Sequence, residues 1–353
     1  MQDKQHSPYL IREHKLYLMN FIASGVSDMC TAISLQSLQR ENFFGRTMDF
    51  SYPIKPGLYV IPRNYEWHSL ATMKKNSNNY SFIGIGQETD GMLGFFDGVN
   101  ERGFAAATLY FEGYAHYELP VENKELVASL DFLHYLLGRC SSVDDVKPLL
   151  ENIHIVGVPD PVTQKAAPLH WIATDRSGKC VVIEQTKNGI EVIDNPLGVM
   201  ANSPDFRWHM TNLRNYMDVS TTQEKQVNWG NVSLTPFGQG AGTIHLPGGF
   251  TSPERFVRTA FLKTHAHLPD NQSETVTTCF HLLNSVFIPK GIIITDRGTY
   301  DYTQYVAFMN TNTCQYYFKT YDNNQIFTAS LWHYNIHGTQ PIYLGSIVYP
   351  AAV

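Results

Sequence analysis

The sequence predicts an α+β protein in which antiparallel sheets carry helices on their outer faces. Two observations lead to this prediction. Blocks of strand-like segments alternate with pairs of helical segments, without an internal repeat or a linker rich in proline and serine. The chain of 353 residues also contains 20 Tyr, 20 Phe, 5 Trp and 25 Gly, a mixture that favours short strands joined by turns. We therefore expect residues 30–353 to form a single domain, preceded by a separate segment at residues 1–29.

Alternating apolar and polar residues predict the strands, and apolar residues at helical spacing predict the helices. The expected strands span residues 30–36, 43–50, 58–61, 80–85, 92–99, 104–111, 169–174, 180–185, 190–193, 291–295, 302–308, 315–321 and 326–330. The expected helices span residues 125–139, 142–153, 204–217, 253–265 and 273–286.

Composition excludes several classes of protein. Hydrophobic residues make up 43% of the chain and charged residues 16%, so a packed core is expected and disorder is not. With 26 Lys and Arg against 32 Asp and Glu, no basic surplus exists to neutralise a nucleic-acid backbone. No run of apolar residues is long enough to span a membrane. The expected partner is a small molecule.

The five cysteines are scattered and lack the spacing of metal ligands. Such a sparse, odd-numbered set is typical of thiols in a reducing compartment, which favours a cytoplasmic protein. A short apolar run at residues 16–26 follows Arg12 and Lys15, so a secretory signal and export stay open. The other readings of residues 1–29 are a propeptide, a dispensable extension, or a start codon assigned too far upstream.

Cys30 follows Met29 directly, and a cysteine in this position can acquire a catalytic role. If translation starts at Met29, or if the chain cleaves itself before Cys30, this cysteine becomes the first residue. It then carries a thiol nucleophile and a free α-amine whose reference pKa is about 7.7–8.0, suited to act as a base near neutral pH. Taken alone, a Met-Cys pair is more often accidental than catalytic.

A hairpin formed by residues 30–36 and 43–50 would bring charged side chains to Cys30. If the hairpin is centred near residues 39–40, Cys30 lies opposite Asp49, with Cβ atoms about 4.5–5.5 Å apart. Arg46 is three residues from Asp49 and would face the other side of a regular strand. We therefore expect a bulge near Gly45 if both side chains are to reach Cys30. The alternative to a role at Cys30 is an ordinary ion pair between Arg46 and Asp49 on the protein surface.

The segment MCTAISLQS…FFGRTMDFSY resembles the start of the choloylglycine hydrolases, which comprise penicillin V acylases and conjugated bile salt hydrolases. Similar stretches include YVIPRNY, DGVNERG, VMANSPDFRWHMTNLRNY and SPERFVR, in order from Met29 to about residue 335. The resemblance implies an N-terminal nucleophile hydrolase with a four-layer αββα sandwich. It also implies a linear amide as substrate, no metal or organic cofactor, and a homotetramer.

The resemblance assigns catalytic roles to residues at the start of the chain. Cys30 matches the nucleophile and, through its own amine, the base, while Asp49 matches the carboxylate that orients this amine. Arg46 matches a guanidinium beside the thiol, where its positive charge would favour the thiolate.

Three later residues match the rest of the catalytic site. Asn202 and the main-chain N–H of Tyr110 match the pair that stabilises the oxyanion of the tetrahedral intermediate. Arg255 matches a further active-site arginine. Without the resemblance, Asn202 would be interpreted as a turn or helix-cap residue, and Arg255 as an exposed residue in the first turn of a helix.

Two positions bear on the substrate. Bile salt hydrolases generally carry asparagine where this chain has Tyr110, and Asn-Asn-Pro where it has Asn202-Ser203-Pro204. Both differences favour the penicillin V acylase branch, and a tyrosine ring can stack on a planar acyl group. The alternatives are a conjugated bile salt hydrolase, an N-acyl homoserine lactone acylase, and a binding protein of the same shape that retains residues 1–29 and is inactive.

Overall fold

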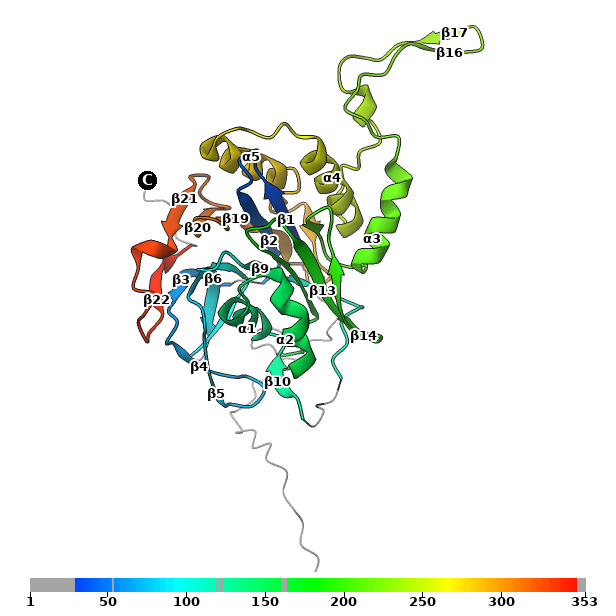
Figure 1. Cartoon of the computed structure of the whole chain (residues 1–353). Coiled ribbons are helices and arrows are strands. Elements are labelled where there is room, and N and C mark those ends of the chain that lie inside the picture. Colours follow the sequence, from blue (N-terminus) through cyan, green and yellow to red (C-terminus); the bar gives the residue numbers. More distant parts are fainter. Residues whose placement is uncertain are drawn as a thin grey trace, which may run out of the picture.

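Two antiparallel sheets pack face to face in the computed structural model, which describes residues 29–52, 54–89, 91–118, 120, 123–159 and 164–347. Helices α4 (Ser252–His265) and α5 (Gln272–Asn284) cover the outer face of one sheet, while α1 (Phe132–Arg139), with α2 (Val146–Asn152) beside it, covers the other (Figure 1). The four-layer αββα sandwich is therefore confirmed. Of the predicted extension at residues 1–29, all but Met29 lies outside the described residues.

The first sheet contains Cys30, the nucleophile predicted from the sequence, and for that reason we call it the nucleophile sheet. Its described strands run in the order β15-β1-β2-β19-β20-β21, with β18 paired to β19. Their bounds are β1 Cys30–Gln36, β2 Asn42–Phe50, β15 Val199–Met200, β18 Ile293–Ile294, β19 Tyr300–Asn310, β20 Gln315–Thr320 and β21 Phe327–Ser330.

The second sheet faces it, and we call it the opposing sheet. Its described strands run in the order β14-β13-β12-β9-β8-β6-β3-β22, with β7 paired to β6. Their bounds are β3 Gly57–Ile61, β6 Phe82–Thr89, β7 Met92–Phe95, β8 Asp97–Asn100, β9 Ala105–Tyr110, β12 Leu169–Thr174, β13 Cys180–Thr186, β14 Gly189–Asp194 and β22 Ile342–Ser346.

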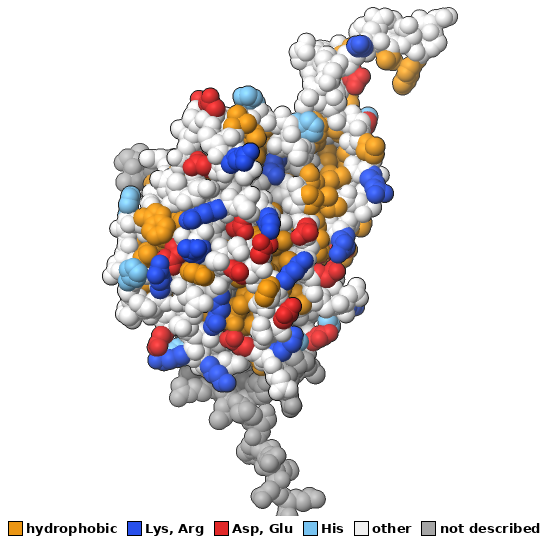
Figure 2. Space-filling view, in the orientation of Figure 1, with side chains coloured by type: hydrophobic (Ala, Val, Ile, Leu, Met, Phe, Trp, Pro, Cys, Tyr) orange, Lys and Arg blue, Asp and Glu red, His pale blue; other side chains and the backbone are white. Residues whose placement is uncertain are grey.

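In the described part of the chain, three small pairs of strands lie outside these sheets: β4 Glu66–His68 with β5 Lys75–Ser77, β10 Glu125–Ala128 with β11 Ile153–Val156, and β16 Val227–Trp229 with β17 Val232–Leu234. The β16–β17 pair forms the tip of an arm that projects from the body of the molecule (Figure 1). Hydrophobic side chains gather on the flank below this arm (Figure 2), and Trp229 and Phe237 of the arm itself are exposed.

Most of the predicted helices are present. The prediction for 253–265 matches α4, where Thr251 and Glu254 form a capping box and proline occupies the first turn. The helix predicted at residues 125–139 is wrong in its first part. Residues 125–128 form strand β10, which pairs in parallel with β11, and the helix α1 begins only at Phe132. The prediction for 204–217 is divided between α3 (Phe206–Asn212) and a 3₁₀ helix at Leu213–Tyr216.

The β1–β2 hairpin forms as predicted, but its register differs by one residue. Cys30 pairs with Met48 rather than Asp49, and Ala32 pairs with Arg46. Because side chains alternate along a strand, this register turns Arg46 to the same face as Cys30 and Asp49 to the opposite face. The bulge expected near Gly45 is therefore not needed, and β2 pairs regularly with β1.

The irregularity lies instead in β19, on the other side of β2. Thr303 pairs with Asp49 and Tyr305 pairs with Met48, so one residue is added to β19 between them. In a regular strand Thr303 and Tyr305 would share a face. The bulge turns Thr303 toward Asp49 on the helix side and Tyr305 toward the layer between the sheets.

Gly45 has a packing role instead. A side chain there would overlap the Phe308 ring and the main-chain oxygen of Ala307 on the neighbouring strand. Phe308 is buried and contacts Phe280 of α5, with ring centroids 5.3 Å apart. Glycine at this position therefore lets α5 seat closely on the nucleophile sheet.

We expect Gly45→Ala to destabilise the fold by about 1–3 kcal/mol, because an added methyl group forces buried neighbours apart. Thermal unfolding measures this loss. Gly248→Ala is the matched control, since a side chain at Gly248 would meet nothing within 4 Å. Equal melting temperatures for the two variants would contradict the packing role.

Candidate functional site

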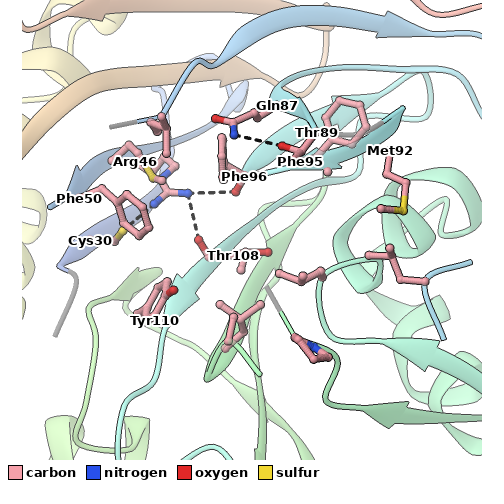
Figure 3. A pocket seen from close by; sticks show the side chains of 18 residues that line it. Cys30, Arg46, Phe50, Gln87, Thr89, Met92, Phe95, Phe96, Thr108 and Tyr110 are labelled. Carbon is pink, nitrogen blue, oxygen red and sulfur yellow. Dashed lines mark hydrogen bonds between the residues drawn. The ribbon is translucent and has the colours of Figure 1, made fainter. Parts of the chain in front are cut away.

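A cavity of about 220 Å³ opens between the sheets, with Cys30 at one end (Figure 3). Its walls are mostly apolar and come from both sheets. Arg46 and Tyr110 add polar groups to this lining, and the polar side chains of Gln87, Thr89 and Thr108 interrupt it elsewhere. The apolar lining includes Met48, Phe50, Ile54, Phe95, Phe96 and Leu169.

Arg46 lies directly beside the Cys30 thiol, as the sequence predicted. Its Nη2 donates to the Cys30 sulfur at 2.7 Å, and Nη1 donates to the main-chain oxygens of Phe96 and Thr108 at 3.0 and 2.9 Å. Nε donates to the oxygen of Thr47 at 3.0 Å. The guanidinium is buried, and these contacts join the nucleophile sheet to the opposing sheet at the end of the cavity.

The Cys30 thiol is protonated at neutral pH in the chain that retains Met29. Burial, with a smaller contribution from the charge of Asp49, raises its pKa to about 11 although Arg46 and Arg255 act to lower it. Arg46 alone therefore does not produce the thiolate that the sequence led us to expect. The site requires a base to take the proton from sulfur.

The Asp49 side chain lies on the other face of β2, and the Cys30 thiol donates instead to the main-chain oxygen of Asp49 at 3.9 Å. Its carboxylate accepts hydrogen bonds from Thr47 Oγ1 at 2.9 Å and from Thr303 Oγ1 at 2.6 Å. Burial raises the pKa of this carboxyl, while Arg255 and the two hydroxyl groups lower it. Asp49 is thus held rigidly beneath the first residues of β1.

Asn202 joins the two sides of the site. Its Oδ1 accepts from the main-chain nitrogen of Cys30 at 2.6 Å, and its Nδ2 donates to the main-chain oxygen of Tyr110 at 2.9 Å. Of the two predicted oxyanion residues, Asn202 therefore contacts the Cys30 nitrogen, while Tyr110 is bound to Asn202 and lines the same cavity as Cys30. The N–H of Phe111 donates to Pro168, so alternation along β9 points the Tyr110 N–H away from β12.

Arg255 is buried and is not an exposed residue of the first helical turn. From α4 it donates to the main-chain oxygen of Cys30, to Thr31 Oγ1 at 2.6 Å and to Asn202 Oδ1 at 2.8 Å. Burial lowers its pKa, and Asp49 raises it. Arg255 therefore fixes the main chain of Cys30 and the orientation of the Asn202 side chain.

Sequence reasoning missed two supporting residues. Thr303 binds Asp49 although 254 residues separate them, so no local pattern could reveal the contact. His209 Nε2 lies 2.8 Å from the main-chain oxygen of Asn202, and burial lowers the pKa of this histidine to about 4. It is therefore neutral near pH 7, and it supports the turn that carries Asn202.

Within the described residues, no cluster of His, Cys, Asp and Glu side chains has the arrangement of a metal site. The same part of the chain contains no helix long and apolar enough to cross a membrane.

The comparisons with known proteins agree on one family. Residues 30–344 match the model of the linear amide C–N hydrolases, choloylglycine hydrolase family. A bile salt hydrolase/transferase from Clostridium perfringens is 36% identical over 88% of this chain and 95% of its own length. A solved variant of the conjugated bile acid hydrolase from Clostridium perfringens superposes with a TM-score of 0.84 at 34% identity, covering 90% of this chain and 96% of that one. A penicillin V acylase from Pectobacterium atrosepticum is 24% identical over 88% of this chain and 83% of its own length.

The raised pKa of Cys30 predicts its reactivity in protein that retains Met29. Because only the thiolate attacks iodoacetamide, alkylation of Cys30 should be slow at pH 7 and rise about tenfold with each pH unit toward a pKa of about 11. Peptide mass spectrometry between pH 6 and 9 measures the rate at Cys30. A rate independent of pH in this range would mean that the thiolate is already formed.

Proposed function

Because the chain belongs to the choloylglycine hydrolase family of linear amide C–N hydrolases, we propose that it hydrolyses the amide of conjugated bile salts, with Cys30 as an N-terminal nucleophile. The observation that carries this proposal is the meeting of Cys30, Arg46 and Asn202 at the end of an apolar cavity. The level of identity to bile salt hydrolases supports the substrate class.

The proposed mechanism begins with removal of residues 1–29, which leaves residues 30–353 as the mature domain. The free α-amine then lies where the Cys30 nitrogen now contacts Asn202, next to the thiol. This amine takes the thiol proton, and the thiolate attacks the amide carbonyl carbon of the substrate. The negative charge moves to the carbonyl oxygen, which the Asn202 amide and the Tyr110 N–H stabilise.

Collapse of this intermediate breaks the carbon–nitrogen bond. The protonated α-amine gives its proton to the leaving amine, and the acyl group stays on sulfur as a thioester. The same amine then takes a proton from water as the water attacks the thioester, and it returns a proton to sulfur when the acid leaves. The α-amine thus serves as base and acid for the thiol, the leaving amine and the water in turn, so the proposed chemistry requires no second side chain as a base.

The cavity suits an apolar acyl group that carries hydroxyl groups. Most of its lining is apolar, but Gln87 Nε2 donates to Thr89 Oγ1 at 3.3 Å within it (Figure 3). Polar side chains in an otherwise apolar pocket orient a ligand through matching polar groups. A hydroxylated bile acid offers such groups, whereas a phenoxyacetyl group has a bare aromatic ring.

The preference for penicillin V that we predicted from Tyr110 and Ser203 has weaker support. The penicillin V acylase is 24% identical to this chain, against 36% for the bile salt hydrolase/transferase. Tyr110 does line the cavity, where its ring lies 5.9 Å from that of Phe50. This aromatic wall keeps penicillin V as the second candidate substrate.

The arm suggests how copies of the chain associate. Apolar side chains are exposed along it, among them Val227, Trp229, Val232, Phe237 and Ile244. Exposed apolar surface of this kind marks interaction sites in soluble proteins. We propose that the arm packs against a second copy of the chain, within the homotetramer that the resemblance led us to expect.

Turnover tests the substrate. Protein with Cys30 as its first residue, confirmed by intact mass, should release glycine or taurine from glycocholate and taurocholate faster than it hydrolyses penicillin V. Cys30→Ser should retain the fold and lose turnover by at least about a thousandfold, because the hydroxyl is a far weaker nucleophile at neutral pH.

Five outcomes would contradict parts of this proposal. Faster hydrolysis of penicillin V would establish the second candidate. Turnover confined to an N-acyl homoserine lactone would exclude both. Active protein that retains residues 1–29, or substantial activity in Cys30→Ser, would exclude Cys30 as an N-terminal nucleophile. Protein that always retains residues 1–29 and is inactive would favour a binding protein.

Charged substitutions on the arm test the association. We expect the double variant Trp229→Glu and Phe237→Glu to shift the protein from a tetramer to smaller species in light scattering coupled to gel filtration, because charges disfavour an apolar contact. Lys225→Glu on the same arm serves as the control for a change of charge alone. A wild-type chain that is monomeric at micromolar concentration would contradict the proposal.

A further inference from the structure

A buried carboxylate lies close to Arg46 without binding it. Asp97, on β8 of the opposing sheet, is buried between the sheets and has an electrostatic interaction with Arg46. Among the described residues, however, Arg46 donates only to three main-chain oxygens and the Cys30 sulfur, and no ion pair within 4 Å joins it to Asp97. A buried arginine and a buried carboxylate attract each other strongly, so something must hold them apart.

Two tyrosine hydroxyls hold the carboxylate. Tyr305 on β19 donates to Asp97 Oδ2 at 2.6 Å, and Tyr316 on β20 donates to Asp97 Oδ1. Both tyrosines are buried and belong to the nucleophile sheet, so they approach Asp97 from across the layer between the sheets. Each carboxylate oxygen thus has a tyrosine donor, which reduces its need to bind the guanidinium.

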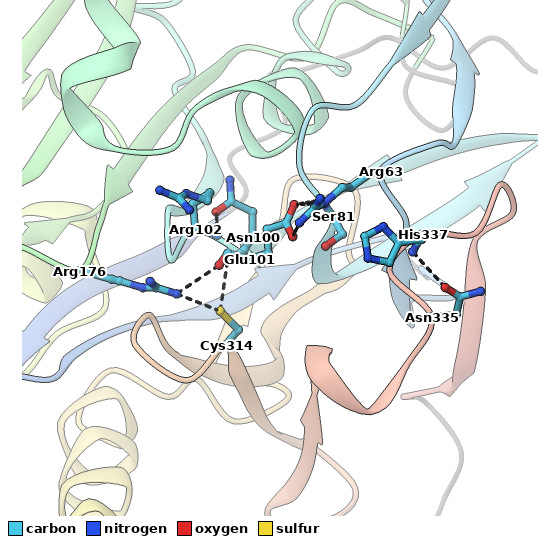
Figure 4. Close-up of polar contacts among 9 residues, drawn as sticks. All are labelled: Arg63, Ser81, Asn100, Glu101, Arg102, Arg176, Cys314, Asn335 and His337. Carbon is cyan, nitrogen blue, oxygen red and sulfur yellow. Dashed lines mark hydrogen bonds and ion pairs between the residues drawn. The ribbon is translucent and has the colours of Figure 1, made fainter.

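Polar contacts also fix the strands that carry this cluster (Figure 4). Arg176 donates to the main-chain oxygen of Glu101, just after β8, and to that of Thr311, in the turn between β19 and β20. Arg63 binds the Glu101 carboxylate from a third direction. The turn after Asp97 and the turn between the two tyrosine strands are therefore tied together.

We propose that Tyr305 and Tyr316 hold Asp97 at a fixed place beside Arg46, so that Asp97 balances the guanidinium charge while Arg46 stays bound to the Cys30 sulfur. In this arrangement the three are positioning residues, because they act on the thiol through Arg46. The inference rests on the proposed role of Cys30 as the nucleophile.

The proposal predicts opposite effects of removing the carboxylate and removing a hydroxyl. Asp97→Asn takes away a negative charge near the thiol, so the thiol pKa should fall and alkylation of Cys30 should speed up. Tyr305→Phe or Tyr316→Phe frees one carboxylate oxygen to bind Arg46 and draw it from sulfur. The thiol pKa should then rise, and alkylation should slow down.

The experiment is the pH profile of iodoacetamide alkylation at Cys30 in the full chain, with the N-terminus of every variant determined by intact mass. We expect each shift to be about one pH unit, or about tenfold in rate at fixed pH. Tyr317→Phe is the matched control, since Tyr317 lies on the same strand but donates to Gln315. Circular dichroism and thermal unfolding confirm that the variants fold.

Shifts in the same direction for Asp97→Asn and Tyr305→Phe, or shifts no larger than that of Tyr317→Phe, would overturn the proposal. If Asp97→Asn does not fold, the two tyrosine variants decide the matter, because each loses a single oxygen atom. Alkylation does not depend on any substrate. A wrong substrate class would therefore appear as absent turnover in the wild type, while the alkylation shifts would remain.

Discussion

The contact between the Arg46 guanidinium and the Cys30 sulfur is the interaction on which the rest of the site depends. A buried guanidinium costs much free energy unless its donors are satisfied, and here main-chain oxygens from both sheets accept from it. Those oxygens leave Nη2 directed at sulfur. The sandwich therefore does more than enclose a pocket, because the packing of its two sheets places a positive charge beside the Cys30 thiol.

Alternation along β2 separates the two charged partners of Cys30. Arg46 faces the layer between the sheets, next to the thiol and the cavity, whereas Asp49 faces α4 and binds Thr303. The bulge in β19 directs Thr303 to the helix-covered face of the sheet, where it binds Asp49, and directs Tyr305 to the layer between the sheets. One strand thereby supports the carboxylate beneath the nucleophile and the cluster around Arg46.

Much of this arrangement could be predicted from the sequence, including the hairpin, most strands and the residues that meet at Cys30. The register could not. Residues 37–41 form the loop, closed by a hydrogen bond from Ser37 to Glu41, with Arg40 at a φ of 62°. A residue in this left-handed conformation is usually glycine or asparagine. Because arginine occupies the position, the sequence did not reveal the five-residue loop, and the loop length sets the register of the two strands.

The contacts missed by sequence reasoning share a physical cause. Asp97, Tyr305 and Tyr316 come from strands of different sheets, and their side chains meet only when the sheets pack. The buried state of Cys30 is likewise a property of the assembled fold. It changes the expected chemistry, because a nearby cation alone does not ionise a thiol whose pKa is raised to about 11. The proposed mechanism therefore gives the α-amine the role of base.

The most direct test of the account is to trap the acyl-enzyme. Glycocholate is mixed with the mature protein, the reaction is quenched in acid within milliseconds, and the peptides are analysed by mass spectrometry. The account predicts a cholyl group bound as a thioester to a peptide that begins at Cys30. A cholyl group on another residue, or turnover by a chain whose Cys30 is still bonded to Met29, would contradict it.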